Sequence, residues 1–221
     1  MVDSGVSVCY FNLHGRAEYI RAMLHYADVP FKNEEITLED WPNHKMSGRF
    51  PFNSMPLVTI DGIAMNQSKA AARAVAIKYG FYHSDPKIIH AIDAILDHNT
   101  EKTVDFAGGY WFNPNKDQEG DDKFVANFKA LGELYENRLK QHGKPWIAGT
   151  NKPTLADFSI VGYYFSTVYN PGSAWGERGL MDRIKNECLA NTPRFKKYLE
   201  ETVMNDPGFK KYNEKKTKYP L

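Results

Sequence analysis

The hydrophobic period of the chain changes near residue 80, and this change constrains the fold more than any other feature. Before it, short stretches with the two-residue period of strands alternate with helix-like stretches, whereas after residue 87 only helical spacing is found. Interleaved strands and helices followed by helices alone are typical of an α/β unit joined to a helical unit. We therefore expect a first domain over 5–80, a linker over 81–86 and an all-helical domain over 87–221.

The first half opens with a strand, a helix and a second strand. Val6, Val8 and Tyr10 alternate with small residues, which is the period of a strand with two different faces. Residues 16–27 carry apolar side chains at helical spacing, and residues 31–36 are expected to form the second strand. This order predicts a βαβ unit at the start of the chain.

A hairpin and a helix complete this domain. The apolar runs 57–60 and 63–65 are joined by Asp61-Gly62, a pair that tolerates the positive φ angles of a tight turn. Ser68 follows as a candidate N-cap for the next helix. The order βαβ and then ββα predicts a small sheet with helices packed on it, which is a thioredoxin-like arrangement.

The second half carries helical patterns only. Thr154 and Asp157 have the spacing of a capping box, in which each side chain bonds the backbone amide of the other. Two later helices are expected over 181–191 and 193–203, and the basic run 210–218 is expected to be a solvated end. The apolar residues that mark the two earlier helices are Ile88, Ile92, Ile95 and Leu96, and then Phe124, Phe128, Leu131, Tyr135 and Leu139.

Composition narrows the class of partner. Lys plus Arg is 28 and Asp plus Glu is 27, and this balance favours neither nucleic acid nor an anionic membrane as partner. Cys9 and Cys188 form no CxxC pair, so neither a redox motif nor a zinc site is expected. With no apolar run of membrane-spanning length and no secretory signal in the first residues, we expect a cytoplasmic protein without a bound metal.

Tyr10 stands at the end of the first strand, shortly before Gly15 and Arg16. An aromatic residue there is usually part of the core, and its hydroxyl is what allows another role. A phenol beside a thiol can donate a hydrogen bond that favours the thiolate, which is the nucleophilic form. Arg16 opens a helix, where the helix dipole disfavours a cation, so an anion site is the better explanation for it.

Four further residues could hold the backbone and one end of a peptide. Pro56 fits the first position of a strand; its bond to Met55 is trans by default, whereas a cis bond would expose the Met55 backbone to an extended ligand. Gln67 and Ser68 lie at a helix start, which is either a simple cap or a place where free amides bind a carboxylate.

Trp41 and Lys45 lie four positions apart in a polar stretch. A tryptophan there more often packs over the core, but its indole N–H and the lysine ammonium could also bind a second carboxylate. Together with Tyr10, Arg16 and the residues around Pro56 and Gln67, they describe a site for a small peptide that has two carboxylates and a thiol.

The segment 10–18, Tyr-Phe-Asn-Leu-His-Gly-Arg-Ala-Glu, resembles the opening of the sigma-class glutathione transferases, the group that includes glutathione-dependent prostaglandin D synthase. The resemblance covers nearly the whole chain and is most specific over the first 80 residues. It continues through Trp41-Pro42, Lys45, Pro51-Phe52, Met55-Pro56, Asp61-Gly62, Gln67-Ser68, Thr154 to Phe158, Pro193-Arg194 and Pro207.

The resemblance implies a role for each matching residue. Tyr10 would donate a hydrogen bond to the sulfur of glutathione, and Arg16 would support the thiolate. Trp41 and Lys45 would hold the glycine carboxylate.

The rest of the glutathione-binding set follows in the chain. Met55, ahead of a cis Pro56, would pair with the cysteine backbone of glutathione, with Ser54 beside it. Gln67 and Ser68 would bind the γ-glutamyl end.

The second substrate would be a small apolar electrophile, held in a neighbouring pocket. The side chains that would build this pocket are Phe11, Leu13, Phe106, Tyr110 and Trp111.

The family is dimeric, and the resemblance implies a homodimer in which the helix after the linker completes the partner's site. Where relatives carry an acid that reaches across the dimer, this chain has Thr100, with Glu101 beside it as the cross-subunit candidate. His14 replaces a common arginine, and Ser54 stands where a longer Gln or Lys is usual. Some relatives bind a divalent ion at this acidic seam, which the departure at Thr100 disfavours.

The leading hypothesis is a glutathione transferase that conjugates the thiolate to apolar electrophiles in detoxification. A glutathione-dependent isomerase of prostaglandins or other peroxides would share the first site and differ only in the second pocket. A non-catalytic transferase-fold subunit of a larger assembly is the third hypothesis.

Overall fold

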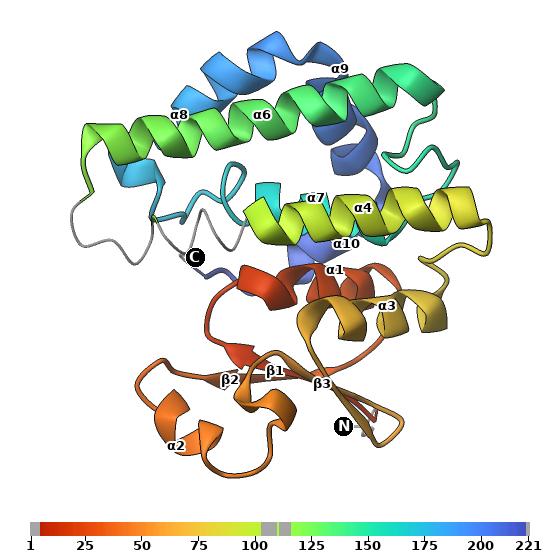
Figure 1. Cartoon of the computed structure of the whole chain (residues 1–221), viewed down its shortest axis with the longest axis vertical. Coiled ribbons are helices and arrows are strands. Elements are labelled where there is room, and N and C mark those ends of the chain that lie inside the picture. The colour runs from red at the N-terminus through yellow and green to blue at the C-terminus, as the bar shows by residue number, and fades with distance from the viewer. Residues whose placement is uncertain (1–4, 103–109, 111–115, 220–221) are drawn as a thin grey trace.

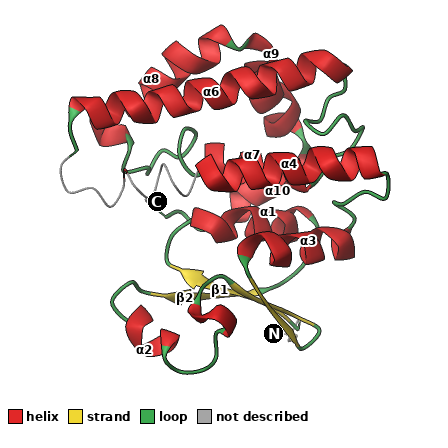
Figure 2. Ribbon diagram, viewed as in Figure 1, coloured by secondary structure: helices red, strands yellow, loops and turns green. Residues whose placement is uncertain are grey.

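The computed structural model describes residues 5–102, 110 and 116–219. All described strands lie in one small sheet at one end of the molecule, and layers of helices are stacked beyond one face of that sheet (Figures 1 and 2). The chain thus combines a thioredoxin-like N-terminal domain with an all-α C-terminal domain, as predicted. No described helix is long and apolar enough to cross a membrane.

The sheet has the strand order β2-β1-β3-β4. The central strand β1 (Val6–Phe11) runs parallel to β2 (Lys32–Ile36) and antiparallel to β3 (Leu57–Ile60), and β4 (Ile63–Asn66) pairs with β3. The inner strands β1 and β3 therefore have a neighbour on each side, and Tyr10 lies near the end of β1, where it pairs with Glu35 of β2.

The predicted hairpin is confirmed. Ile60 pairs with Ile63, so the connecting loop is the two residues Asp61 and Gly62. Their φ angles of 52° and 78° are those of a tight turn that an Asp-Gly pair adopts at little steric cost.

Helices α1 (Glu18–Tyr26) and α3 (Ser68–Tyr79) lie between the sheet and the helical domain (Figure 1). The segment Gly15–Ala17 is a 3₁₀ turn, so α1 begins two residues later than predicted. The N-cap of α3 is Gln67, with a φ of 67°, and Ser68 is the first helical residue; the expected Ser68 cap is therefore wrong by one position.

Two short elements occupy the stretch expected to be a polar loop. They are α2 (Trp41–Lys45) and the 3₁₀ turn η2 (Pro51–Asn53). The helix begins with Pro42 in its first turn, where a missing N–H leaves no intrahelical bond unmade. A helix of one turn is too short to leave a periodic pattern in the sequence.

Residues 80–85 lead from α3 to the helical domain. The α-helices described in this domain are, in chain order, α4 (Pro86–Lys102), α6 (Gln118–His142), α7 (Leu155–Tyr164), α8 (Leu180–Arg183), α9 (Pro193–Lys197) and α10 (Pro207–Lys215). Shorter helical segments lie between the later ones: η5 (Ile184–Cys188), η6 (Leu189–Asn191) and η7 (Tyr198–Val203). Both α7 and α10 pack on α1. A Cβ on Gly162 of α7 would lie 3.0 Å from the backbone nitrogen of Tyr19, so this glycine permits the close approach of α1 and α7.

The predicted capping box at the start of α7 is confirmed. The Thr154 amide donates to Asp157 Oδ2 over 2.7 Å, and Asp157 Oδ1 accepts from the Ile147 amide and the Tyr198 hydroxyl. Asp157 is fully buried, and these bonds fix the loop before α7 against the later helices.

The expectation of a solvated basic end is wrong. Residues 207–215 form α10, which buries Phe209 and Tyr212, and Tyr219 beyond it is also buried. Lys210, Lys211 and Lys215 are exposed on this helix, and the last two pair with Asp28. The expectation rested on the many lysines in this run, although Phe209 and Tyr212, three positions apart, lie on one side of a helix.

Candidate functional site

The Tyr10 side chain leaves the end of β1 beside the loop that leads to α1. The backbone amide of Arg16 donates to the Tyr10 hydroxyl oxygen over 3.2 Å. Because the oxygen already accepts this bond, the hydroxyl hydrogen is the atom free to point toward a ligand.

Burial raises the pKa of Tyr10, and the Arg16 amide together with the charges of Arg16 and Arg21 only partly opposes this effect. The phenol therefore stays protonated at neutral pH. It can act as a hydrogen-bond donor to a thiolate and not as a phenolate base.

Gly15 is required by the packing around this hydroxyl. Its φ is +44°, and a Cβ there would lie 2.6 Å from Leu13 Cδ1 and 2.8 Å from the Tyr10 oxygen. A side chain at this position would displace the hydroxyl that the loop is built around.

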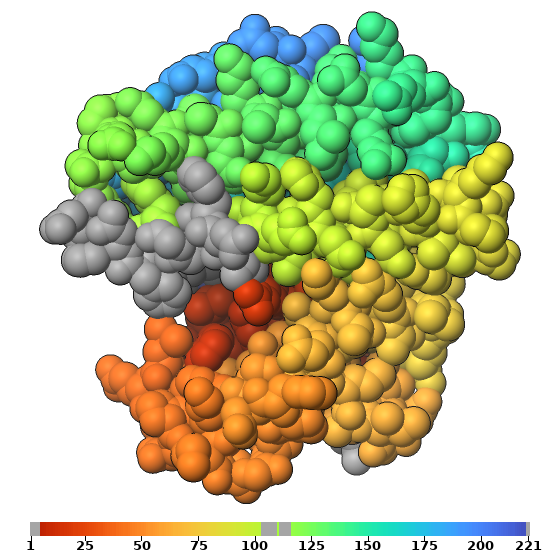
Figure 3. Space-filling model, viewed as in Figure 1, coloured from red at the N-terminus to blue at the C-terminus, as the bar shows by residue number. Residues whose placement is uncertain are grey.

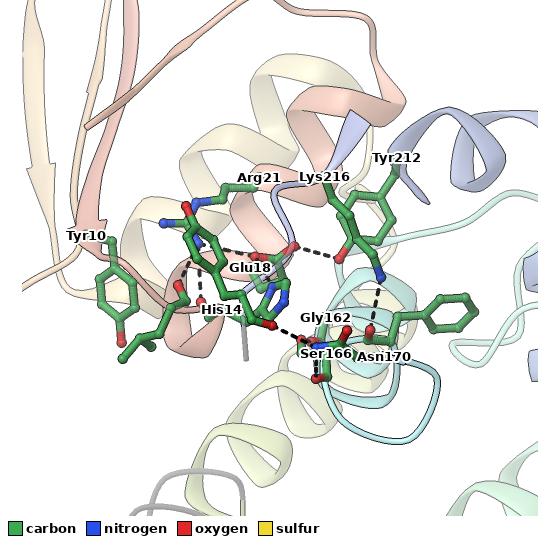
Figure 4. A network of polar contacts seen from close by, with 12 residues as sticks. Tyr10, His14, Glu18, Arg21, Gly162, Ser166, Asn170, Tyr212 and Lys216 are labelled. Atoms are coloured by element: carbon green, nitrogen blue, oxygen red, sulfur yellow. Dashed lines mark hydrogen bonds and ion pairs between the residues drawn. The ribbon is translucent and has the colours of Figure 1, made fainter. Parts of the chain in front are cut away.

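A buried polar cluster lies behind the loop (Figure 4). Glu18 accepts from the Tyr212 hydroxyl over 2.6 Å, and its other oxygen lies 3.0 Å from His14 Nδ1 and 3.2 Å from Arg21 Nη1. Burial alone would raise the pKa of Glu18, but the hydrogen bonds and charges of these neighbours hold it at about 2. The carboxylate is therefore ionised at neutral pH.

Arg21 connects this cluster to the loop. Its Nη1 donates to the Leu13 carbonyl over 2.9 Å and to the His14 carbonyl over 3.4 Å, and its Nε donates to Asn33 Oδ1 on β2. One buried guanidinium thus ties the start of the loop to both the helix and the sheet. The roles of Glu18 and Arg21 were not predicted from the sequence, where their only signal is charge inside an otherwise apolar helix.

A second part of the site lies where β3 begins. The Met55-Pro56 bond is cis, as the resemblance implied. Asn66 is buried and donates to the Ser54 carbonyl over 2.7 Å and to the Pro56 carbonyl over 2.9 Å, and the Ser54 hydroxyl donates to its side-chain oxygen. Asn66, also missed from the sequence, holds the backbone on both sides of Met55.

The start of α3 lies beside this turn. Gln67 is exposed and adopts a φ of 67°, which is uncommon for a residue with a side chain. The Gln67 side chain makes no capping hydrogen bond to the first amides of the helix. The first turn of α3 can therefore offer N–H groups and the helix dipole to a carboxylate.

Trp41 is half-buried at the start of α2. Its ring packs edge-on against Phe11 at 5.7 Å and Phe50 at 5.1 Å, and Lys45 lies exposed one turn along the helix. The red N-terminal segment forms the floor of a hollow in the surface, between the orange segment that contains α2 and the light-orange segment that contains α3 (Figure 3).

The proposed electrophile pocket is described only in part. Phe11 and Leu13 are half-buried beside Tyr10, whereas Phe106 and Trp111 lie outside the described residues. Tyr110 is buried, and its ring packs at 5.0 Å from that of Phe124. Its hydroxyl donates to Asp121, so its polar end is used within the helical domain.

The end of α4 carries the cross-subunit candidate. Thr100 is half-buried, and its hydroxyl donates to the Leu96 carbonyl, while Glu101 is exposed. The Thr100 side chain is therefore bonded within its own helix, whereas the Glu101 carboxylate lies at the surface.

The acids earlier on α4 are paired within the chain. Asp93 accepts from Arg73 Nε over 2.7 Å, and Asp97 lies 3.0 Å from Lys69 Nζ. Among the described residues, no cluster of His, Cys, Asp and Glu side chains could hold a metal ion. These ion pairs join α4 to α3, the helix that begins at Ser68 and is preceded by Gln67.

Cys9 is buried in β1. Burial, with the nearby charge of Glu34 next, raises the pKa of its thiol to about 11. A thiol that stays protonated is a poor nucleophile, so Cys9 is not suited to nucleophilic chemistry.

Several curated proteins are similar to this chain in sequence. The chain is 30% identical over 197 residues to glutathione S-transferase alpha M14 of Sus scrofa, with 86% of each chain covered. It is 33% identical over 159 residues to the probable glutathione S-transferase 6 of Caenorhabditis elegans, with 68% of this chain and 74% of that protein covered. No protein-family model matches.

Two solved structures share the fold. Prostaglandin synthase D of Nilaparvata lugens superposes with a TM-score of 0.74 at 23% identity, covering 96% of this chain and 98% of that chain. A monomeric glutathione S-transferase of Necator americanus gives a TM-score of 0.78 at 22% identity, covering 98% and 99%. The chain therefore belongs to the glutathione S-transferase family, whose enzymes use glutathione as their co-substrate.

Proposed function

We propose that this chain conjugates the thiolate of glutathione to apolar electrophiles and that Tyr10 stabilises the thiolate. The observation that carries the proposal is the hydrogen bond from the Arg16 amide to the Tyr10 oxygen, which leaves the hydroxyl hydrogen to donate to sulfur. A hydrogen bond to the charged form lowers the pKa of a thiol from about 8.5 toward neutrality. The Arg16 side chain, which is exposed at the loop, adds positive charge beside the sulfur.

The domain formed by residues 5–80 would hold glutathione along its length. Trp41 and Lys45 would bind the glycine carboxylate at α2, and the backbone of Met55 would pair with the cysteine residue of the ligand. Gln67 and Ser68 would bind the γ-glutamyl carboxylate at the start of α3, where uncapped amides are available.

The domain formed by residues 87–221 would supply most of the electrophile pocket. Phe11 and Leu13 bring apolar surface from the first domain to within contact of Tyr10. The sigma-like class, the cytoplasmic location, the role in detoxification and the homodimer belong to the same proposal.

Replacement of Tyr10 by phenylalanine tests the role of the hydroxyl. In Tyr10→Phe, we expect the pKa of the bound glutathione thiol, measured by thiolate absorbance against pH, to rise toward about 8.5. Conjugation of a generic aromatic halide should fall at neutral pH, and glutathione affinity should change little. Tyr79→Phe is the matched control, since Tyr79 lies on α3 and outside the site.

An unchanged thiol pKa in Tyr10→Phe would show that the hydroxyl does not activate the thiol. A chain that failed to bind immobilised glutathione at all would instead favour the non-catalytic subunit.

Isomerisation of a prostaglandin endoperoxide is the second candidate. The likeness in fold to prostaglandin synthase D of Nilaparvata lugens favours it. The same thiolate would attack an endoperoxide oxygen, forming an S–O bond as the O–O bond breaks; loss of the proton from the carbon that bears the sulfur-bound oxygen would then form a carbonyl and release the thiolate. Both activities would use the first site and differ in the second pocket. Product analysis after incubation with an endoperoxide and glutathione separates them.

A further inference from the structure

The last described residues cross from the helical domain to the sheet. After α10, Lys216 Nζ donates to the Phe165 carbonyl over 3.0 Å, and the Tyr219 carbonyl accepts from Asn170 Nδ2 over 2.9 Å. Asn170 and Tyr219 are both buried. The segment is thus held at both ends on the polypeptide that follows α7 (Figure 4).

The Tyr219 side chain continues from there to strand β2. Its hydroxyl donates to Glu35 Oε1 over 2.5 Å and accepts from Asn33 Nδ2 over 2.9 Å. Asn33 is also the residue whose side-chain oxygen accepts from Arg21 Nε. A single amide therefore joins the hydroxyl of Tyr219 to the guanidinium of Arg21.

The Tyr219 ring also touches this guanidinium. The Arg21 Cζ atom lies 5.2 Å from the Tyr219 ring centroid and 5.8 Å from the Tyr10 ring centroid. The His14 ring packs edge-on against Tyr219 at 5.1 Å. Arg21 is therefore placed between the catalytic tyrosine and a tyrosine from the far end of the chain.

This placement matters because Arg21 holds the loop. A free arginine side chain samples many rotamers, and a stacked ring with a bonded amide removes that freedom. With the guanidinium fixed, its bonds to the Leu13 and His14 carbonyls fix the loop that carries the Arg16 amide.

We propose that Tyr219 is a positioning residue for thiol activation, acting through Arg21 on the loop that aligns Tyr10 and Arg16. The proposal rests on the role given to Tyr10 in the proposed function. It differs from a simple tether of the C-terminal end, because a tether would contribute to stability and leave the chemistry of the bound thiol unchanged.

The test compares three variants of the full chain. Tyr219→Ala removes the ring and the hydroxyl, Tyr219→Phe keeps the ring, and Lys218→Ala changes the exposed neighbour as a control. The readouts are the pKa of the bound glutathione thiol, kcat and KM for glutathione, and the free energy of unfolding. If Tyr219→Ala gives no folded protein, Tyr219→Leu is used in its place, because leucine keeps apolar volume at the position but has no π face.

For Tyr219→Ala we expect the thiol pKa to rise by about half a unit to one unit, which is a loss of about threefold to tenfold in thiolate below that pKa. The deficit in kcat/KM should shrink as pH rises, and Tyr219→Phe should lie between the alanine variant and the wild type. Lys218→Ala should match the wild type.

A thiol pKa that is unchanged in Tyr219→Ala overturns the proposal, whatever happens to stability. The two proposals fail separately. If Tyr10→Phe raises the thiol pKa and Tyr219→Ala does not, only the positioning role falls; if Tyr10→Phe has no effect, the proposed thiol activation itself is wrong.

Discussion

The backbone amide of Arg16 lies 3.2 Å from the Tyr10 hydroxyl oxygen and donates to it. A backbone donor cannot be removed by a side-chain substitution, so its position depends on the conformation of the loop. Residues 13–15 set that conformation, so a substitution among them can shift the Tyr10 hydroxyl while Tyr10 itself stays unchanged.

Gly15→Ala should disable thiol activation. The φ of +44° disfavours alanine, and the new Cβ would lie within 2.9 Å of Leu13 and Tyr10 atoms. We expect a fall in kcat/KM of about tenfold or more at neutral pH, corresponding to a rise of at least about one unit in the thiol pKa. Steady-state kinetics and thiolate absorbance measure the two effects.

Gly80→Ala is the control for Gly15→Ala, because it introduces backbone strain without a steric clash. Gly80 has a φ of +82°, but a Cβ there would meet nothing within 4 Å. Its substitution should lower the free energy of unfolding by about 1 kcal/mol and leave the activity of the folded enzyme unchanged. Equal kinetic losses in both variants would contradict the proposed contact with Tyr10.

Asn66→Asp should weaken glutathione binding. The change removes the two N–H bonds to the Ser54 and Pro56 carbonyls and sets a carboxylate against them, which we expect to lower the free energy of unfolding by about 1–3 kcal/mol. Since these carbonyls flank Met55, KM for glutathione should rise by about tenfold with kcat within about twofold. Asn151→Asp is the exposed control, and an unchanged KM would contradict the role of Asn66.

Features that depend on neighbours in sequence could be predicted. The Asp61-Gly62 turn and the Thr154-Asp157 capping box each follow from two or three residues with a specific backbone requirement, and both are confirmed. The Tyr10 hydroxyl could be suggested in the same way because Gly15 and Arg16 follow it closely.

Features that depend on distant residues could not be predicted. Glu18 bonds Tyr212, which is 194 positions away, and nothing in either segment indicates the pairing. Tyr219 reaches Asn33 and Arg21 only because α10 packs on α1. Periodicity identifies a helix and its buried side, but it does not say which element covers that side.

Glu18 should make stability depend on acid pH. Its pKa of about 2 lies below the ordinary value of 4.5, so the native state favours the ionised carboxylate. The stabilisation is fully present above about pH 4.5 and is lost as pH falls toward about 2.

Glu18→Gln removes this dependence. At pH 7 the variant should be less stable by about 3–5 kcal/mol, because Arg21 loses a buried counter-charge. Urea unfolding should show the same difference from wild type at pH 7 and pH 5 and a smaller difference at pH 3. The exposed Glu39→Gln serves as control, and a difference that stays constant with pH would contradict the assignment.

Phe52→Ser should convert the proposed homodimer to a monomer. Phe52 is 77% exposed on η2, and its φ of 60° is strained for an aromatic residue. We therefore expect a second copy of the chain to pack on this side chain. Sedimentation velocity should give a dimer for the wild type and for the control Leu38→Ser, whose side chain is 51% exposed, and a monomer for Phe52→Ser. A monomeric wild type, as in the Necator americanus structure, would refute the homodimer, whereas a dimeric Phe52→Ser would place the contact elsewhere.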